Sequence, residues 1–166
     1  MARKSIELKR MLRPLVFPLV FSTALFGQKY SGPQPDKPDL PYLMHADNLV
    51  ATEPGEAKEE KRKDDVIAVI DGATSSAATP LASPIFVIRT DKLDPNQLEI
   101  YKLESKNGHR EVLLSHKQKQ VARPVQCTVT RLTDELYRLE VNQELPNGEY
   151  SITPRGSDQV FCFRIY

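Results

Sequence analysis

The side chains best suited to catalysis or metal binding are few and scattered along this sequence. The three histidines are His45, His109 and His116, and the two cysteines are Cys127 and Cys162. The sequence has no Gly-x-Ser-x-Gly elbow, no His-Glu-x-x-His pair, no Cys-x-x-Cys pair and no glycine-rich phosphate loop. We therefore assign no catalytic, cofactor-binding or metal-binding residue, and we expect no cofactor.

Two short segments carry metal-ligating side chains at close spacing. His45-Ala-Asp47 offers a nitrogen and an oxygen ligand, and Asp91, Asp94 and Asn96 offer oxygen atoms of the kind that Ca²⁺ prefers. We interpret the first segment as a histidine beside a turn aspartate and the second as a polar turn before a strand. The alternative is a small metal-dependent or hydrolytic enzyme whose site is assembled from such scattered residues.

One loop is distinctly basic. It contains His116, Lys117, Lys119 and Arg123, with no acidic residue among them. Clustered positive charge raises the local field even on a protein of low net charge, so this loop is a candidate site for an anionic glycan or lipid headgroup. It has no interleaved aromatic residues, so we expect no nucleic-acid binding. The simpler interpretation is a solvated loop.

The N-terminus has the plan of a signal peptide. Residues 1–13 carry five basic residues and one acidic residue, and residues 14–27 are almost entirely apolar. The apolar stretch contains two prolines and is shorter than the roughly 20 residues that cross a bilayer. We predict that residues 1–27 are cleaved as a signal peptide and leave no stable transmembrane anchor. Met11 is an alternative start.

Export sets the expected compartment and charge. The whole chain has a formal net charge of +1, and without residues 1–27 the charge becomes −3. We expect a secreted protein, periplasmic or extracellular. The form of the signal segment and the lack of any Asn-x-Ser/Thr sequence favour a bacterial host. An oxidising compartment permits a disulfide, so Cys127 and Cys162 are a candidate pair.

Residues 28–64 are poor in side chains that could form a core. Their first part has a proline every few residues, and residues 55–65 are nearly all charged. We predict mostly a linker or extended arm, with either a short helix or an extended spacer in the charged part. The exception is the segment LPYLMHADNLV, residues 40–50, whose apolar side chains are expected to dock on the domain.

Residues 65–166 have the pattern of an all-β sandwich. Short runs rich in Val, Ile, Tyr and Phe alternate with Gly, Pro, Asn and Asp at roughly 10-residue spacing. We predict a two-sheet antiparallel, immunoglobulin-like sandwich of about seven to eight strands. The expected strands are 66–71, 84–89, 97–106, 109–115, 125–132, 136–142, 149–154 and 159–166.

The turn residues predict which strands pair and in which register. Asn107-Gly108 is a two-residue hairpin signal, because both positions require positive φ. It places Lys106 opposite His109, and it puts Tyr101, Leu103, Val112 and Leu114 on one face with Lys102, Glu104 and Glu111 on the other. Loops at 133–135 and 155–158 predict four further pairs: Val129 with Leu139, Cys127 with Val141, Ile152 with Phe161, and Tyr150 with Phe163.

This register separates the two cysteines. Cys162 alternates with Phe161 and Phe163, so it faces outward when those rings face the core, whereas Cys127 faces inward. A disulfide needs both sulfur atoms on one side. Three alternatives follow: a bulge shifts the last strand, the N-terminal arm covers Cys162, or the two thiols are not paired.

The segment Leu145-Pro-Asn-Gly148-Glu-Tyr150 resembles the tyrosine corner of immunoglobulin-like and fibronectin-III-like sandwiches. The resemblance implies that Tyr150 donates its hydroxyl to a nearby backbone group, that Gly148 makes the turn and that Leu145 fills the core. The chain has no tryptophan, and Ile152 stands where the second cysteine of an immunoglobulin domain would be. The closer resemblance is to immunoglobulin-like modules of secreted bacterial proteins.

These observations favour a secreted, non-catalytic β-sandwich module that acts in protein–protein or cell-envelope interaction. We expect the partner to be another envelope or extracellular protein, with residues 28–64 as a tether or docking strand. The alternatives are the scattered-site enzyme and anionic-glycan binding through residues 116–123. If the strand at 84–89 or the last strand lies at a sheet edge, a partner strand could also pair with it.

Overall fold

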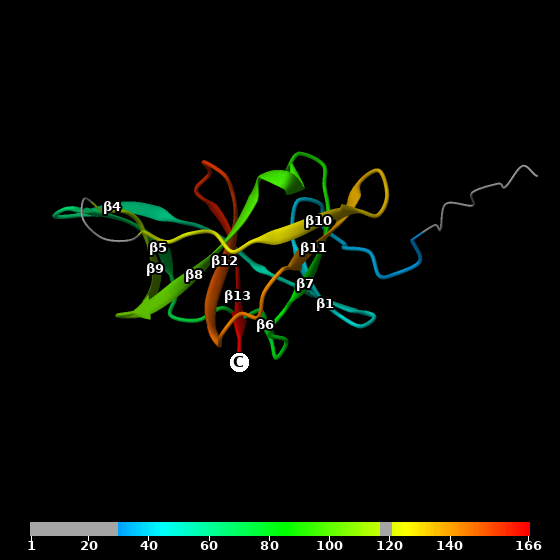
Figure 1. Ribbon diagram of the computed structural model, residues 1–166, viewed down its shortest axis with the longest axis horizontal. Helices are drawn as coiled ribbons and strands as arrows, with labels where there is room; N and C mark the ends of the chain where they lie inside the picture. Colours follow the sequence, from blue (N-terminus) through cyan, green and yellow to red (C-terminus); the bar gives the residue numbers. More distant parts are fainter. Residues whose placement is uncertain (1–29, 117–120) are drawn as a thin grey trace, which may run out of the picture.

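The computed structural model describes residues 30–116 and 121–166, and it has the predicted all-β architecture. Two antiparallel sheets pack against each other as a sandwich (Figure 1). The one helix in the described residues is the three-residue 3₁₀ turn η1, Pro95–Gln97, and no helix there is long and apolar enough to cross a membrane. The predicted signal segment and Lys117 and Lys119 lie outside the described residues.

The first sheet has five strands in the order β10-β11-β7-β1-β2. Its hairpin β1–β2 is made by residues of the expected arm and pairs with β7 through β1. The bounds are β1 Tyr42–His45, β2 Asn48–Ala51, β7 Ile85–Arg89, β10 Cys127–Arg131 and β11 Leu136–Val141.

The second sheet follows the order β3-β13-β12-β8-β9-β5-β4, with the short β6 added in parallel beside β13. The two ends of this order, β3 and β4, are separated in sequence only by Ala57, so the sheet curls round and returns to its first strand. The bounds are β3 Glu53–Glu56, β4 Lys58–Arg62, β5 Asp65–Asp71, β6 Ala78–Thr79, β8 Leu98–Lys106, β9 His109–His116, β12 Gly148–Pro154 and β13 Gln159–Ile165.

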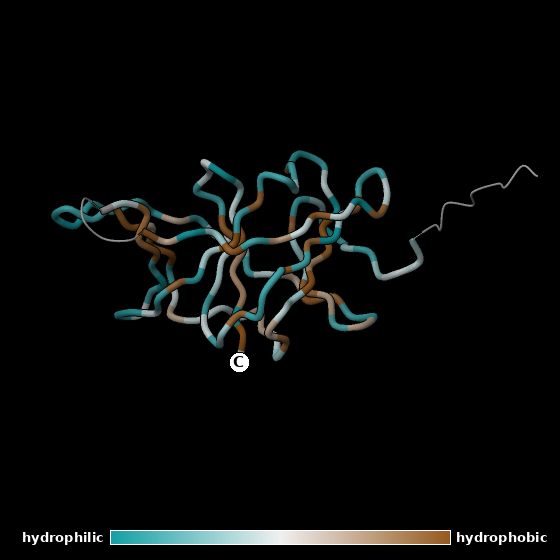
Figure 2. The backbone as a smooth tube through the Cα atoms, in the orientation of Figure 1, coloured by the Kyte–Doolittle hydropathy of each residue, from teal (hydrophilic) through white to brown (hydrophobic). Residues whose placement is uncertain are grey.

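Strands β12 and β13, together with the first half of β8, form a layer that is covered on both faces, whereas Lys102, Glu104 and Lys106 of β8 are exposed. One face packs on the five-stranded sheet and makes the main core, where Phe163 contacts Phe86 edge-on and stacks on Tyr150. Figure 2 shows hydrophobic residues, in brown, concentrated where the strands cross the middle of the molecule. The buried members of this main core are Leu40, Tyr42, Leu43, Ala77, Phe86, Ile88, Leu98, Ile100, Leu139, Val141, Leu145, Tyr150, Ile152, Phe161, Phe163 and Ile165.

The other face of this layer lines the inside of the curled sheet, which holds a second and smaller core. Figure 1 shows β4, β5 and β9 at the opposite end of the molecule from β1, β7 and β11. The small size of several members leaves room for charged side chains in the same interior. The buried apolar members are Ala68, Ile70, Leu103, Val112, Val160 and Cys162, with Ala57, Tyr101 and Ala122 packed against them.

The predicted strands agree with the structure, and the predicted registers agree except in the far part of the first hairpin. There the β8–β9 ladder ends at Glu104 and Glu111, Leu114 is 43% exposed rather than inward, and Glu111 is buried rather than outward. Each of the eight expected strands corresponds to one of β5 and β7–β13. The hairpin turn has Asn107 at φ 52° and Gly108 at φ 83°, and Lys106 lies opposite His109 as predicted. The four register pairs predicted from the other two loops are also present.

The expectation of a linker over residues 28–64 is wrong for residues 42–62, which form strands β1–β4. The docking segment was expected, and its Leu40, Tyr42 and Leu43 are buried in the main core. The charged segment was expected to be a helix or a spacer, but β3 pairs with β13 and β4 pairs with β5. Most of its charged side chains stay exposed while its backbone completes the sheet, so composition alone did not reveal these strands; Glu53 and Arg62 are the partly buried exceptions.

The two cysteines are not bonded to each other, and both thiols are free. Cys127 lies on β10 and packs against the main core, whereas Cys162 belongs to the second core on the far face of β13. The predicted parity was therefore right, and Cys162 is only 1% exposed because the curled sheet closes over it, with Ala68, Ile70 and Val112 in the same cluster and Ala57 of the expected arm packed against it. Glu53 on β3 is the cross-strand partner of Cys162.

The segment that resembles a tyrosine corner makes a compact local contact. The Tyr150 hydroxyl donates a hydrogen bond to the Pro146 carbonyl oxygen at 2.6 Å. Gly148 has φ 152°, and Leu145 is buried in the main core. These contacts hold the start of β12 against the sandwich.

We predict that Tyr150→Phe lowers the free energy of unfolding by about 1 kcal/mol, because it removes one hydrogen bond at a buried ring and leaves the packing unchanged. Equilibrium urea unfolding measures the change. Tyr166→Phe is the matched control, because Tyr166 is 60% exposed. An equal effect of the two substitutions would contradict a stabilising role for the Tyr150 hydroxyl.

Candidate functional site

A cavity opens where β8 and β9 separate. The two strands pair only from Glu104 to Lys106 on β8. Earlier residues of β8 pair with β12 on its other edge, and Ile100 forms a bridge with Val125. The segment that begins at Val121 partly fills the gap: Ala122 N donates to Leu113 O at 3.1 Å. The remaining space is about 570 Å³, with walls from β4, β5, β8, β9 and residues 121–122.

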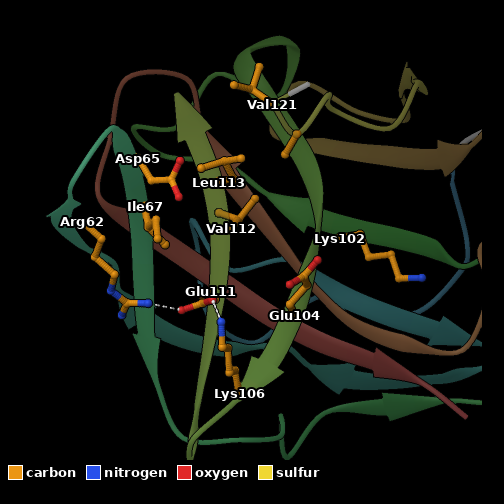
Figure 3. Close-up of a pocket in the computed structure, with 11 residues that line it drawn as sticks. Arg62, Asp65, Ile67, Lys102, Glu104, Lys106, Glu111, Val112, Leu113 and Val121 are labelled. Atoms are coloured by element: carbon orange, nitrogen blue, oxygen red, sulfur yellow. Dashed lines mark hydrogen bonds and ion pairs between the residues drawn. The ribbon is translucent and has the colours of Figure 1, made fainter. Parts of the chain in front are cut away.

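An ion cluster around Glu111 forms one side of this cavity (Figure 3). Arg62 Nη1 lies 2.7 Å from one carboxylate oxygen of Glu111, and His109 Nε2 lies 3.2 Å from the same oxygen. Lys106 Nζ lies 3.5 Å from the other oxygen. Through Glu111, Arg62 links β4 to β9 across β5. Arg62 also pairs with Glu60 of its own strand at 2.9 Å.

The surroundings of Glu111 favour its charged form. Its side chain is only 9% exposed, and burial by itself would raise the pKa. The hydrogen bonds from Arg62 and His109 and the charge of Lys106 outweigh that effect, so the pKa of Glu111 lies below its ordinary value. The carboxylate is therefore a fixed negative charge that holds three basic side chains in place.

Two other charged side chains line the cavity without a charged partner in the described residues. These are Lys102 and Glu104, both exposed on the outward face of β8. Figure 3 shows Lys102 extending away from the Glu111 cluster, while Ile67, Val112 and Leu113 supply apolar wall. The cavity thus offers a positive and a negative group, two residues apart, beside an apolar surface.

A second ion cluster is buried inside the curled sheet. Arg110 is 1% exposed, and its Nη2 atom lies 2.7 Å from Glu53 Oε1 and donates to the Asp71 carbonyl at 2.7 Å. Arg110 Nε donates to the Gly72 carbonyl at 2.9 Å. Its Nη1 atom lies 3.9 Å from Glu149 Oε2 and makes no hydrogen bond. A buried charge is tolerated when it is paired in this way.

The two carboxylates of this cluster also hold the loop that follows β5. Glu149 accepts hydrogen bonds from the Thr74 hydroxyl at 2.6 Å and from Ser75 N at 2.9 Å. Glu53 accepts one from Ser76 N at 2.7 Å. Burial would raise the pKa of Glu53, but the bonds from Ser76 and Arg110 lower it below the ordinary value. The cluster therefore ties β3, β9, β12 and this loop together.

Neither thiol has the surroundings of a nucleophile. Burial raises the pKa of Cys162 to about 11; the charge of Arg110 opposes this rise, and the charges of Glu53 and Glu149 add to it. Burial also raises the pKa of Cys127. A reactive cysteine needs a lowered pKa, so these thiols serve as packing groups.

The histidine and aspartate candidates lie in structural contacts. His45 Nε2 lies 2.9 Å from Thr79 Oγ1, which joins the β1–β2 hairpin to β6. Asp94 caps η1 by accepting from Asn96 N at 2.9 Å. No group of three or more His, Cys, Asp or Glu side chains within residues 30–116 and 121–166 is placed to hold a metal ion.

The candidate anion-binding loop is only partly described. Lys117 and Lys119 lie outside the described residues, His116 ends β9 opposite Asp65, and the Arg123 side chain is exposed. The buried charges Arg110, Glu53 and Glu149 were not predicted. A signal for one of them was present: Arg110 is in phase with Val112, so the strand parity already placed it on the inner face.

The chain was compared with protein-family models, with curated proteins and with solved structures, and none of them matches it. The site is therefore interpreted from its own geometry. That geometry consists of a charged cavity at the opening between β8 and β9, supported from inside by a buried ion cluster.

We predict that Arg110→Met lowers the free energy of unfolding by about 3 to 5 kcal/mol, because it leaves two interior carboxylates without a positive charge. Arg131→Met is the control, since its partner Asp134 is 99% exposed, and it should cost less than about 1 kcal/mol. The double variant Arg110→Met with Glu149→Gln should recover part of the loss in urea unfolding. Additive costs would contradict coupling between Arg110 and Glu149.

We predict that the protein loses stability as the pH falls through about 4.5, the ordinary pKa of a glutamate. The pKa values of Glu111 and Glu53 are lower in the folded chain than in the unfolded chain, so the unfolded chain binds protons first and is favoured by acid. Glu111→Gln should reduce the loss measured by urea unfolding between pH 7 and pH 3.5. A slope unchanged by this substitution would contradict the role given to Glu111.

Proposed function

We propose that this chain is a secreted, non-catalytic β-sandwich module that binds another protein of the cell envelope or extracellular space. The observation that carries the proposal is the cavity between β8 and β9, in which Lys102 and Glu104 have no charged partner in the described residues. Two groups of opposite charge at a set spacing favour a partner surface with the complementary arrangement of charges, whatever the net charge of that partner.

The construction of the cavity supports a binding role. The Glu111 cluster fixes the basic side chains at one end, and the strands beneath are held by the Arg110 cluster. Such a surface is formed before the partner arrives, so little side-chain order has to be gained on binding. The apolar wall from Ile67, Val112 and Leu113 provides area that a partner would remove from water.

A charge swap tests this proposal without altering the net charge. The double variant Lys102→Glu with Glu104→Lys reverses the local pattern, and we predict that it lowers partner recovery about tenfold. The full-length chain with a C-terminal affinity tag serves as bait on envelope and extracellular fractions, with recovered proteins quantified by mass spectrometry.

The matched control is the swap Lys58→Asp with Asp71→Lys, which exchanges the ends of an exposed ion pair at 3.1 Å. It should leave recovery unchanged. Equal recovery by the wild type and the cavity swap would remove the cavity from the interaction. A bait that recovers nothing above an untagged control would contradict the proposed function itself.

A further inference from the structure

The five-stranded sheet has two edges in the described residues, β2 and β10. The strands suggested as edges from the sequence are interior, since β7 lies between β11 and β1, and β13 lies between β3 and β12. In the curled sheet, the end strands β3 and β4 follow each other through Ala57 and are mostly charged and exposed, which disfavours pairing with another chain. The first sheet offers strand pairing at β2 or at β10.

A groove runs beside β10 at the open side of the sandwich. It has a volume of about 290 Å³ and lies between β10 and the start of β8. Val125, Cys127 and Val129 form one wall, and each of these side chains is only half-buried. A strand added to β10 would place alternate side chains over this groove, so the groove suits an apolar side chain of an incoming strand.

The charges along this edge are positive. From residue 112 to residue 133 the sequence has no acidic residue. Arg123 is exposed and has no charged partner in the described residues. Arg131 forms an ion pair with Asp134, which is 99% exposed, and it also donates to the carbonyl oxygens of Thr133 and Asp134. The acidic residue in the groove, Glu99, is already engaged, because Arg155 Nε lies 2.8 Å from one of its oxygens.

The second oxygen of Glu99 accepts a hydrogen bond from the Tyr101 hydroxyl at 2.8 Å. Arginines therefore stand near both ends of the open edge, and the one carboxylate beside it is neutralised. This charge pattern complements an extended segment that carries carboxylates.

We propose that β10 binds an extended acidic segment of a partner protein, which becomes a sixth strand of the first sheet. Main-chain groups of the segment pair with the open side of Cys127–Arg131. An apolar side chain enters the groove against Val129, and carboxylates lie near Arg123 and Arg131. The exposed pair of Arg131 with Asp134 is weak, so a carboxylate of the partner can replace Asp134 at small cost.

A second copy of the chain fits this edge less well. Antiparallel pairing of two β10 strands would bring Arg131 of one copy toward the Arg123 end of the other, so two positive segments would adjoin. Like charges that face each other across strands are destabilising. The acidic segment of a different protein therefore agrees with the charges, and self-association is an outcome that the test can reveal.

The test measures amide hydrogen exchange by NMR on the full chain, with a blocked octapeptide of alternating glutamate and valine as the probe. We expect at least tenfold slower exchange for the open-side amides of Cys127–Arg131, and no change for Asn48–Ala51 on β2. Arg123→Glu should weaken peptide binding about tenfold. Lys61→Glu, an exposed charge reversal on β4, should leave it unchanged.

Three results would overturn this inference. Unchanged exchange at β10 with millimolar peptide would rule out strand addition at this edge. Equal protection by a lysine–valine octapeptide would rule out the acidic partner. Protection that grows with protein concentration in the absence of peptide would make a second copy the occupant. None of these results bears on the cavity between β8 and β9, which is tested by the Lys102 and Glu104 swap.

Discussion

The structure depends on one constraint: strands β12 and β13 have both faces covered along most of their length. A strand exposed on one side alternates apolar and polar residues, but here the second face also has to be removed from water. That face holds small and apolar side chains together with Glu149, and it meets Arg110 from β9. Buried charges need partners, so the Arg110 cluster follows from the double burial rather than being a separate feature.

Much of the fold was predictable because turn residues fix register. Asn107-Gly108 requires a two-residue turn, and that turn sets Lys106 against His109 and sends Leu103 and Val112 inward. Residues 53–62 were not predictable in this way. Their composition indicates solvated side chains, which is right for most of them but not for Glu53, and it does not indicate that their backbone pairs with β13 and β5.

The cavity could not be predicted from the sequence, for a related reason. The hairpin rule extends the β8–β9 ladder to Tyr101 and Leu114, but the ladder stops at Glu104 and Glu111. Leu114 is 43% exposed, and it lies at the irregularity in the β5–β9 register, where Ile67 pairs with Leu113 and Val66 with Ser115. How far a ladder extends is decided by packing across the whole molecule, not by the local turn. The charged opening exists because the two strands part there, and the Glu111 cluster closes the end where they still pair.

The junction at Ala57 has a consequence for the order of assembly. Glu53 on β3 lies opposite Cys162 on β13, so an early strand pairs with the last one. The ring of strands therefore cannot form until the C-terminal segment has been synthesised and is in place. Contacts so distant in sequence slow the search for the native state. Until the ring closes, the apolar residues of β13 are exposed to solvent. A partly folded chain of this kind is prone to aggregation, and a chaperone would protect it.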